Sequence, residues 1–161
     1  MKNANILVEI KVKKLDSYDE NLALPTYQSE LAAGADIRLC LEKKFRDSAL
    51  IIKPWERVAL PTGLAFEIPA NFEIQVRPRS GLSLKTGLML LNSPGTIDAD
   101  YRGELKVLMI NNSPNEVQLN HGERIAQLVL APVSIANYTL SFTELSKTQR
   151  GERGFGSTGL N

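Results

Sequence analysis

The sequence has very few of the residue types that build disulfides and metal clusters. Its 161 residues include one cysteine, Cys40, and one histidine, His121. A lone cysteine cannot form an intramolecular disulfide, and one Cys with one His cannot supply the usual ligands of structural zinc. We therefore expect a reducing compartment and no zinc site. Cys40 is interpreted as a small buried hydrophobe and His121 as a surface residue in a turn.

An excess of charge of one sign and long apolar runs are lacking as well. Nineteen Lys and Arg against eighteen Asp and Glu give a formal charge of +1, which removes the general electrostatic case for binding nucleic acid or a membrane surface. The longest apolar stretches, 88–91 and 128–133, fall far short of the roughly 18 residues that a membrane helix needs. The N-terminus lacks the apolar core and cleavage site of a signal peptide. We expect a cytoplasmic protein without nucleic-acid or membrane partners.

Short strand patterns separated by turn residues fill most of the chain. Gly and Pro clusters such as Pro61-Thr62-Gly63 separate them. A short helix is predicted over 80–85, with Ser80 as N-cap and Gly87 as stop, and a second short turn is predicted to start over 17–20. Many short strands at near-regular spacing predict an all-β fold, an antiparallel jelly roll, in a single domain over 1–149. The Gly-rich residues 150–161 form a C-terminal arm of that domain. The predicted strands are 6–12, 35–41, 49–53, 57–60, 64–68, 72–77, 104–110, 125–133 and 138–142.

Residues 154–159 match the pattern Gly-x-Gly-x-x-Gly without its structural context. That fingerprint requires a helix after the glycines, and the sequence ends at Asn161. Two interpretations remain, a frayed tail and a lid whose amides and hydroxyls close over a polyphosphate. Phe155 favours the lid, because a lone aromatic among glycines has no core to enter and can stack on a base.

Two further segments carry groups suited to anion or water chemistry. Arg77 and Arg79 flank a proline before the predicted helix, which suits an anion site or, equally, a solvated strand end. In 95–104, Asp98 and Asp100 point to the same side of an extended chain. Either aspartate can orient a water or bind magnesium, although a polar hairpin tip explains the same residues.

Five segments together resemble the ordered motifs of trimeric deoxyuridine triphosphate nucleotidohydrolases (dUTPases). They are 33–37, 78–82, 95–103, 122–128 and 150–159, and they occur in the family's order and spacing. One departure is Arg153, where many relatives have Gly, and it affects how the arm closes. The resemblance implies a β-clip-like jelly roll that forms a homotrimer. Each active site then combines phosphate-binding motifs of one subunit, a base-binding hairpin of a second and the exchanged C-terminal arm of a third.

The resemblance also implies a role for each matching residue. Asp98 matches the aspartate that activates the water attacking the α-phosphorus, and Tyr101 matches the residue under the deoxyribose, where a 2′-hydroxyl would clash. The groups that match the family's hydrogen bonds to uracil are Asn92, the backbone of Thr96, Ile97 and Asp98, and the facing strand around Lys106. The residues that match phosphate contacts are Arg79, Ser80, Gly81 and Gln127. On the arm, the residues that match γ-phosphate contacts are Arg150, Ser157 and Thr158. Phe155 matches the aromatic residue that covers the uracil.

The implied reaction is Mg²⁺-assisted hydrolysis of dUTP to dUMP and pyrophosphate. It supplies dUMP for thymidylate synthesis and keeps uracil out of DNA. Mg²⁺ is expected mainly on the triphosphate, and the role of Asp36 is divided between structural pairing and a water-mediated contact with the metal. Two alternatives stay open, a dCTP deaminase-like enzyme of the same fold and a jelly roll that binds nucleotides without hydrolysing them.

Overall fold

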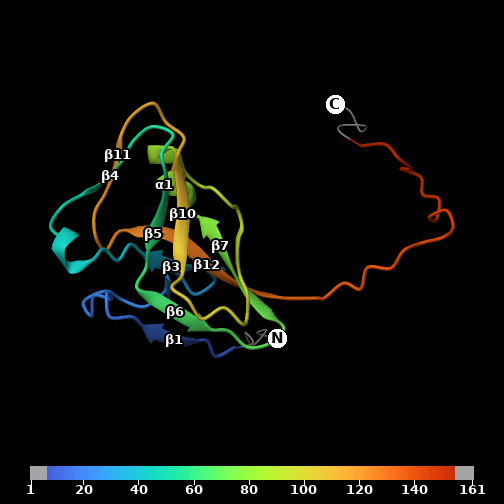
Figure 1. Ribbon diagram of the computed structural model, residues 1–161, viewed down its shortest axis with the longest axis horizontal. Helices are drawn as coiled ribbons and strands as arrows, with labels where there is room; N and C mark the ends of the chain where they lie inside the picture. The colour runs from blue at the N-terminus through green and yellow to red at the C-terminus, as the bar shows by residue number, and fades with distance from the viewer. Residues whose placement is uncertain (1–6, 155–161) are drawn as a thin grey trace.

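The computed structural model describes residues 7–154, and short strands dominate it (Figure 1). One helix, α1 (Ser80–Thr86), and one 3₁₀ turn, η1 (Lys43–Phe45), interrupt them. The strands are β1 (Lys11–Lys14), β2 (Thr26–Tyr27), β3 (Ala35–Arg38), β4 (Leu50–Ile52), β5 (Arg57–Pro61), β6 (Leu64–Glu67), β7 (Phe72–Pro78), β8 (Leu88–Leu90), β9 (Gly95–Ile97), β10 (Lys106–Asn111), β11 (Val117–Leu119) and β12 (Arg124–Pro132).

All of the strand pairs are antiparallel, and they form four small sheets around one core. The largest sheet has the order β2-β3-β12-β7-β9, and a second has the order β5-β10-β8. The pairs β1-β6 and β11-β4 complete the arrangement. Apolar side chains alternate inward along these strands, as in β10, where Val107 and Met109 are buried and Lys106 and Leu108 are exposed. The predicted all-β, antiparallel jelly-roll fold is confirmed.

The first strand and the last predicted strand differ from the sequence prediction. Of the predicted strand 6–12, residue 6 lies outside the described residues and 7–10 form no strand. β1 covers 11–14, where it pairs with β6 from Lys11 opposite Glu67 to Lys14 opposite Leu64. No strand forms over 138–142 in the described chain, where Tyr138 is 93% exposed and has no sheet edge beside it. Strands β2, β8, β9 and β11, of two or three residues each, were not predicted as strands.

The helix begins and ends almost where predicted, but its first cap is a different residue. Arg79, in extended conformation, is the N-cap, and its carbonyl accepts a hydrogen bond from the Ser83 amide at 3.0 Å. Ser80 is therefore the first helical residue, and its prediction as N-cap was wrong. Gly87 ends the helix with a φ of 76°, as expected of a residue that must adopt the left-handed conformation. No helix in the described part of the chain has the length and apolarity to cross a membrane.

After β12 the chain leaves the body of the molecule as a long extended segment (Figure 1). Residues 133–154, here called the extension, form no strand or helix, and their side chains are exposed throughout. Large apolar side chains lie on it, with Ile135 93% and Phe142 91% exposed. Large apolar side chains normally pack against a core or a partner surface. In a single chain, those of the extension are left uncovered.

Candidate active site

A cavity of about 420 Å³ opens where β9 and the loops on either side of it meet β10. We call the segment 92–104, matched to the base-binding hairpin of the resemblance, the hairpin, and the cavity the hairpin cavity. Its floor is apolar, with Val76 from β7, Leu90 from β8 and Leu108 from β10. Its rim carries residues of several chemistries, and the set predicted to read the base and sugar lies there together. These rim residues are Asn92, Gly95, Thr96, Ile97, Asp98, Tyr101, Glu104 and Lys106.

Backbone pairing fixes the hairpin over this cavity. Ile97 of β9 lies opposite Ile74 of β7, and Gly95 lies opposite Val76. A Cβ atom on Gly95 would sit 3.2 Å from Cβ of Val76, so glycine permits the close approach of the two strands. Asp98 follows directly after β9 with an exposed side chain, and its carbonyl accepts the Tyr101 amide at 3.2 Å. The turn therefore presents the Asp98 carboxylate at the cavity mouth.

The ring of Tyr101 is held in place from two sides. Its phenol donates a hydrogen bond to the carbonyl oxygen of Glu104 at 3.0 Å. The ring also lies against Gly103, where a Cβ atom would come within 2.7 Å of Cζ. With 45% of the residue exposed, Tyr101 presents a ring to the cavity while its hydroxyl is tied down. Only glycine leaves room for this ring position.

The sequence interpretation missed Glu104 as a member of this cavity. Its side chain is 19% exposed, and Oε2 lies 3.4 Å from Nζ of Lys106. Oε1 accepts the amide of Gly63 at 2.9 Å. In the sequence, Glu104 is simply a charged residue at a strand start, and nothing in the pattern distinguishes it from a solvated one.

The four residues matched to phosphate contacts, here called the phosphate set, do not line the hairpin cavity. Ser80 and Gly81 are exposed at the start of α1. Gln127 of β12 lies in register between Asp36 of β3 and Arg77 of β7. Arg79, the fourth member, is engaged in a separate polar cluster. Within one chain, the phosphate set and the base-reading residues thus form two sites.

That cluster is centred on Asp36, which is 4% exposed. Nε of Arg79 donates to Oδ1 at 3.2 Å, and Nη1 of Arg124 donates to Oδ2 at 3.0 Å. Nη1 of Arg79 also donates to the carbonyl of Arg124 at 3.0 Å. Both carboxylate oxygens therefore have arginine partners, which favours the pairing role over the metal role for Asp36. Arg124 was missed, although it lies in the same resemblance segment as Gln127.

Of the predicted arm contacts, only Arg150 falls inside the described residues. Its side chain is exposed on the extension, and its Nε donates to the carbonyl of Arg153 at 2.8 Å. Arg153 returns a bond from its own Nε to the carbonyl of Arg150 at 3.0 Å. Phe155, Ser157 and Thr158 lie outside the described residues, so their predicted roles stay predictions.

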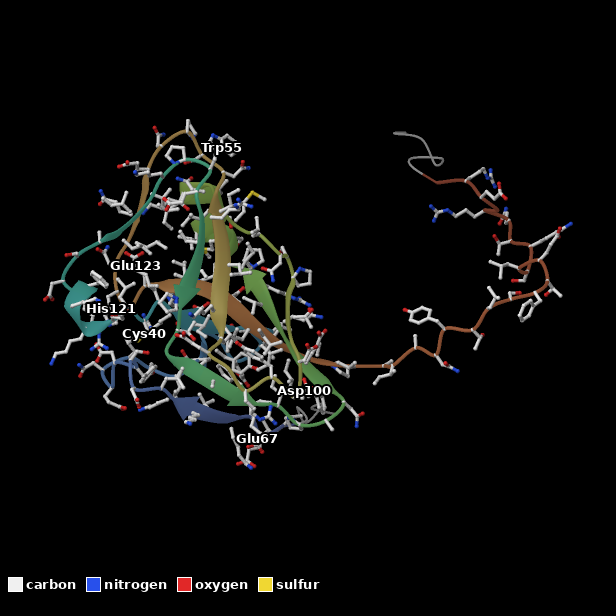
Figure 2. The ribbon with its side chains drawn as sticks, in the orientation of Figure 1. Cys40, Trp55, Glu67, Asp100, His121 and Glu123 are labelled. Carbon is white, nitrogen blue, oxygen red and sulfur yellow. The ribbon has the colours of Figure 1, made fainter. Side chains whose placement is uncertain are left out.

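His121 is not the surface histidine that the sequence suggested. Its side chain is 12% exposed, its Nδ1 accepts the amide of Leu41 at 3.0 Å, and its Nε2 lies 3.0 Å from Oδ2 of Asp19. Because Nδ1 is an acceptor, Nε2 carries the proton and donates to Asp19. A turn residue was predicted correctly, but the ring contacts Asp19 and the Leu41 amide and is largely buried. Figure 2 places His121 on the far side of the body from Asp100, away from the hairpin.

Cys40 is buried, as predicted, with 1% of its surface exposed. Burial raises the pKa of the Cys40 thiol above its ordinary value, so the unreactive protonated form is favoured. Its Sγ donates to the carbonyl of Ser17 at 3.5 Å. The residue is a packing element and offers no nucleophile.

Comparison with known proteins gives one family. The family model described as dUTPase matches residues 20–159. The chain belongs to the dUTPase family. A deoxyuridine 5′-triphosphate nucleotidohydrolase of Desulfotalea psychrophila is 54% identical over 141 residues, 88% of this chain and 90% of that protein. The counterpart in Bdellovibrio bacteriovorus is 52% identical over 150 residues, 93% of this chain and 95% of that protein.

A solved structure resembles the whole fold. The dUTPase of Staphylococcus bacteriophage 80alpha, determined with dUPNHPP, superposes with a TM-score of 0.80 at 27% identity and covers 94% of this chain and 99% of its own. The resemblance to dUTPases seen in the five sequence segments is thereby confirmed at the level of family and fold.

Proposed function

We propose that this protein hydrolyses dUTP to dUMP and pyrophosphate, and so supplies dUMP for thymidylate synthesis and keeps uracil out of DNA. One observation carries the proposal: the residues matched to base, sugar and attacking water come together on the single hairpin cavity. They are Asn92, Thr96, Ile97, Asp98, Tyr101 and Lys106. These residues span fifteen positions of sequence, from the loop after β8 through β9 to the first residue of β10, and the fold brings all of them onto one cavity.

Asp98 is the proposed general base. Its exposed carboxylate stands at the cavity mouth, where it can take a proton from a water molecule. The water oxygen then forms a bond to the α-phosphorus, and the bond from that phosphorus to the bridging oxygen of the β-phosphate breaks. Pyrophosphate leaves with the electron pair, and dUMP remains with the new oxygen. No covalent enzyme intermediate is needed, which agrees with the burial of Cys40.

Sugar and base selectivity follow from the walls of the same cavity. The Tyr101 ring, held against Gly103, forms a flat surface on which a deoxyribose packs and a 2′-hydroxyl collides. Backbone groups of the β9 hairpin face the uracil edge, and the apolar floor contributes Leu90 and Leu108. A cavity of about 420 Å³ suits a nucleoside, and unpaired polar edges left by cytosine would cost binding energy.

Mg²⁺ is proposed to be held mainly by the triphosphate of the substrate. Among residues 7–154 no group of three His, Cys, Asp or Glu side chains lies together, and Asp36 already pairs with two arginines. When bound, the cation would neutralise phosphate charge during the reaction. The chain's own part is to place arginine and amide donors around the phosphates, from Arg79, Ser80, Gly81 and Gln127.

We further propose that three copies assemble and share their sites, with the cytoplasm as the compartment. Two features of a single chain support the trimer: the phosphate set lies outside the hairpin cavity, and the extension carries uncovered apolar side chains such as Tyr138 and Phe142. A neighbour that covers the extension would bring the arm 150–161 to a cavity of another copy. In this arrangement Phe155 covers the uracil, and Arg150, Ser157 and Thr158 contact the γ-phosphate.

The test is product formation from purified protein given dUTP, UTP, dTTP and dCTP in parallel with Mg²⁺. Pyrophosphate release from dUTP, at least about a hundredfold faster than from the other three, is the expected result. Ammonia release from dCTP would instead establish the deaminase alternative. Tight dUTP binding without any release would establish the non-hydrolysing alternative.

Shared sites have a separate test in mixed assemblies. Asp98→Asn and Arg79→Ala each inactivate a different part of the composite site. Refolding the two inactive proteins together should restore activity, because some sites then combine an intact hairpin with an intact phosphate set. A mixture as inactive as its components would contradict sharing, and sedimentation of the wild-type protein as a monomer would contradict the trimer.

A further inference from the structure

Glu104 is the one charged residue on the hairpin cavity, among the described residues, to which neither the resemblance nor the comparisons assign a role. We infer that Glu104 is a positioning residue for sugar selectivity: its carboxylate anchors the peptide whose carbonyl holds the Tyr101 phenol. This inference rests on the proposed function, since it concerns how dUTP is distinguished from UTP.

The anchor is a hydrogen-bonded joint between two segments far apart in sequence. Oε1 of Glu104 accepts the Gly63 amide at 2.9 Å. The next residue, Leu105, donates its amide to the Leu64 carbonyl at 2.8 Å and accepts the Thr62 hydroxyl at 2.6 Å. Thr62 and Leu105 are each 1% exposed. Bonds in such a dry environment are strong and costly to lose, so the joint fixes where the 104–105 backbone lies.

Gly63 cannot move freely toward or away from this carboxylate. Its φ of 66° is one that L side chains rarely adopt, and a Cβ there would lie 3.1 Å from Cα of Tyr18 and 3.2 Å from Sγ of Cys40. The amide that Glu104 binds is therefore part of a tightly packed turn. It is a fixed point to which the hairpin is tied.

That hydrogen-bonded joint determines the position of the Tyr101 ring. Its phenol bonds to the carbonyl of Glu104, only three residues along the chain, and Gly103 packs against the ring between them. A shift of the Glu104 peptide would move the phenol oxygen and tilt the ring. The space under a 2′-hydroxyl would then open, and selectivity against UTP would fall more than catalysis.

The second carboxylate oxygen of Glu104 orients the positively charged side chain of Lys106 at the cavity rim. Oε2 lies 3.4 Å from Nζ of Lys106, whose side chain is 51% exposed. A half-exposed pair of this kind contributes little to stability, but it limits the orientations of the lysine at the cavity rim. Glu104 thus has two separable functions. Its hydrogen bond to the Gly63 amide depends on the length of the side chain (its reach), and its ion pair with Lys106 depends on its charge.

Two conservative variants separate reach from charge. Glu104→Gln keeps the length and an oxygen that accepts the Gly63 amide but loses the charge. Glu104→Asp keeps the charge but is shorter by one methylene, so it withdraws from Gly63. The measured quantity is the ratio of kcat/KM for dUTP to that for UTP in the full-length protein. Glu104→Asp and Glu104→Ala should lower the ratio about tenfold, the value of one hydrogen bond, and Glu104→Gln less than about threefold.

Glu67→Ala serves as the matched control. Glu67 also pairs with a lysine on a strand, with Oε1 3.0 Å from Nζ of Lys11, but it lies outside the hairpin cavity. The ratio of kcat/KM for dUTP to that for UTP in Glu67→Ala should equal that of the wild type. If Glu104→Ala fails to fold in a thermal melt, the Asp and Gln variants decide alone.

The outcomes are distinct for this inference and for the proposed function. A ratio unchanged in Glu104→Asp, or lowered as far in Glu104→Gln as in Glu104→Asp, overturns the positioning role of the Gly63 bond. A wild-type protein that does not hydrolyse dUTP, or does not prefer it to UTP, overturns the proposed function itself. Imido analogues of dUTP and UTP, titrated calorimetrically, should show the same selectivity in binding.

Discussion

Nε of Arg79 lies 3.2 Å from Oδ1 of Asp36, and this ion pair joins β3 to the residue that caps α1. Arg79 also donates to the carbonyl of Arg124 at 3.0 Å, so its guanidinium is held on two sides before any ligand arrives. A guanidinium that is already ordered loses less conformational entropy on binding a phosphate. Under the proposed function, Asp36 contributes to phosphate binding by holding an arginine in place.

Asp36→Asn tests that role against the metal role. The amide cannot satisfy both Arg79 and Arg124, and leaving buried donors poorly paired should lower the free energy of unfolding by about 1–3 kcal/mol. The loss should appear in urea unfolding without Mg²⁺ or nucleotide. Asp47→Asn, at an exposed position, is the control and should be neutral. Full recovery of activity at raised Mg²⁺, with unchanged stability, would instead support a metal contact.

Gly103→Ala should move the Tyr101 ring, the proposed contact of the sugar, without altering Asp98, the proposed general base. The added Cβ would lie 2.7 Å from Cζ of Tyr101, so the ring must move. We expect the preference for dUTP over UTP to fall about tenfold, with a larger change in KM than in kcat for dUTP. Steady-state kinetics with both nucleotides measure this. An unchanged preference would mean that the ring position does not set sugar selectivity.

Asp98→Asn should leave folding and dUTP binding nearly intact and remove most of the hydrolysis. Its side chain is exposed and forms no ion pair within the described chain, so little stability depends on its charge. Loss of a general base lowers the rate by about 10²–10⁴-fold. Single-turnover hydrolysis, compared with titration of an imido analogue, separates chemistry from binding. More than about half of the wild-type rate would exclude Asp98 as the base.

The sequence predicted the architecture well, because the fold is built from strands whose inward faces alternate along the chain. It failed where tertiary contacts decide the outcome. β1 begins at Lys11 because β6 pairs there, and 138–142 forms no strand because a single chain offers it no edge. His121 contacts Asp19, which is 102 residues away in sequence, and no local pattern encodes that contact.

The site shows the same division between local and distant information. The hairpin residues Asp98 and Tyr101 were identified through their contiguous segment, which the sequence displays directly. Glu104 and Arg124 were missed because their partners, Gly63 and Asp36, are 41 and 88 residues away in sequence. A charged side chain whose partner is that distant looks like any solvated residue until the fold brings the two together.

Asp19 should make the stability of the protein depend on acid pH. The Asn21 amide donates to Oδ1, and His121 and Arg46 face Oδ2, so the pKa of Asp19 is lowered below its ordinary value. A lowered folded-state pKa means that the stabilisation is present above the unfolded-state pKa and is lost as the pH falls through the folded-state value. Asp19→Asn should therefore be less stable than the wild type near neutral pH, and this difference should shrink below about pH 4. Urea unfolding of both proteins across the pH range measures it, and a difference that grows in acid would contradict the sign.

Truncation after Gln149 should give a folded trimer that hydrolyses dUTP poorly. The side chains of 150–154 are exposed and belong to the extension, so removing these described residues of the arm uncovers no part of the core. The removed residues carry two arginines, a serine, a threonine and Phe155, which are the groups proposed to close over the uracil and the γ-phosphate. Closure excludes water and fixes the α-phosphorus, so its loss should lower the chemical step more than binding.

Three measurements on the truncated protein decide between the possible roles of the arm. Thermal unfolding and sedimentation should match the full-length protein, while single-turnover hydrolysis should fall at least about tenfold. Full activity would make the arm a tail without function. A truncated protein that unfolds or sediments as a monomer would make the arm a structural strap between subunits. Removal of only 160–161 is the matched control, because it leaves Phe155, Ser157 and Thr158 in place, and its rate should equal that of the full chain.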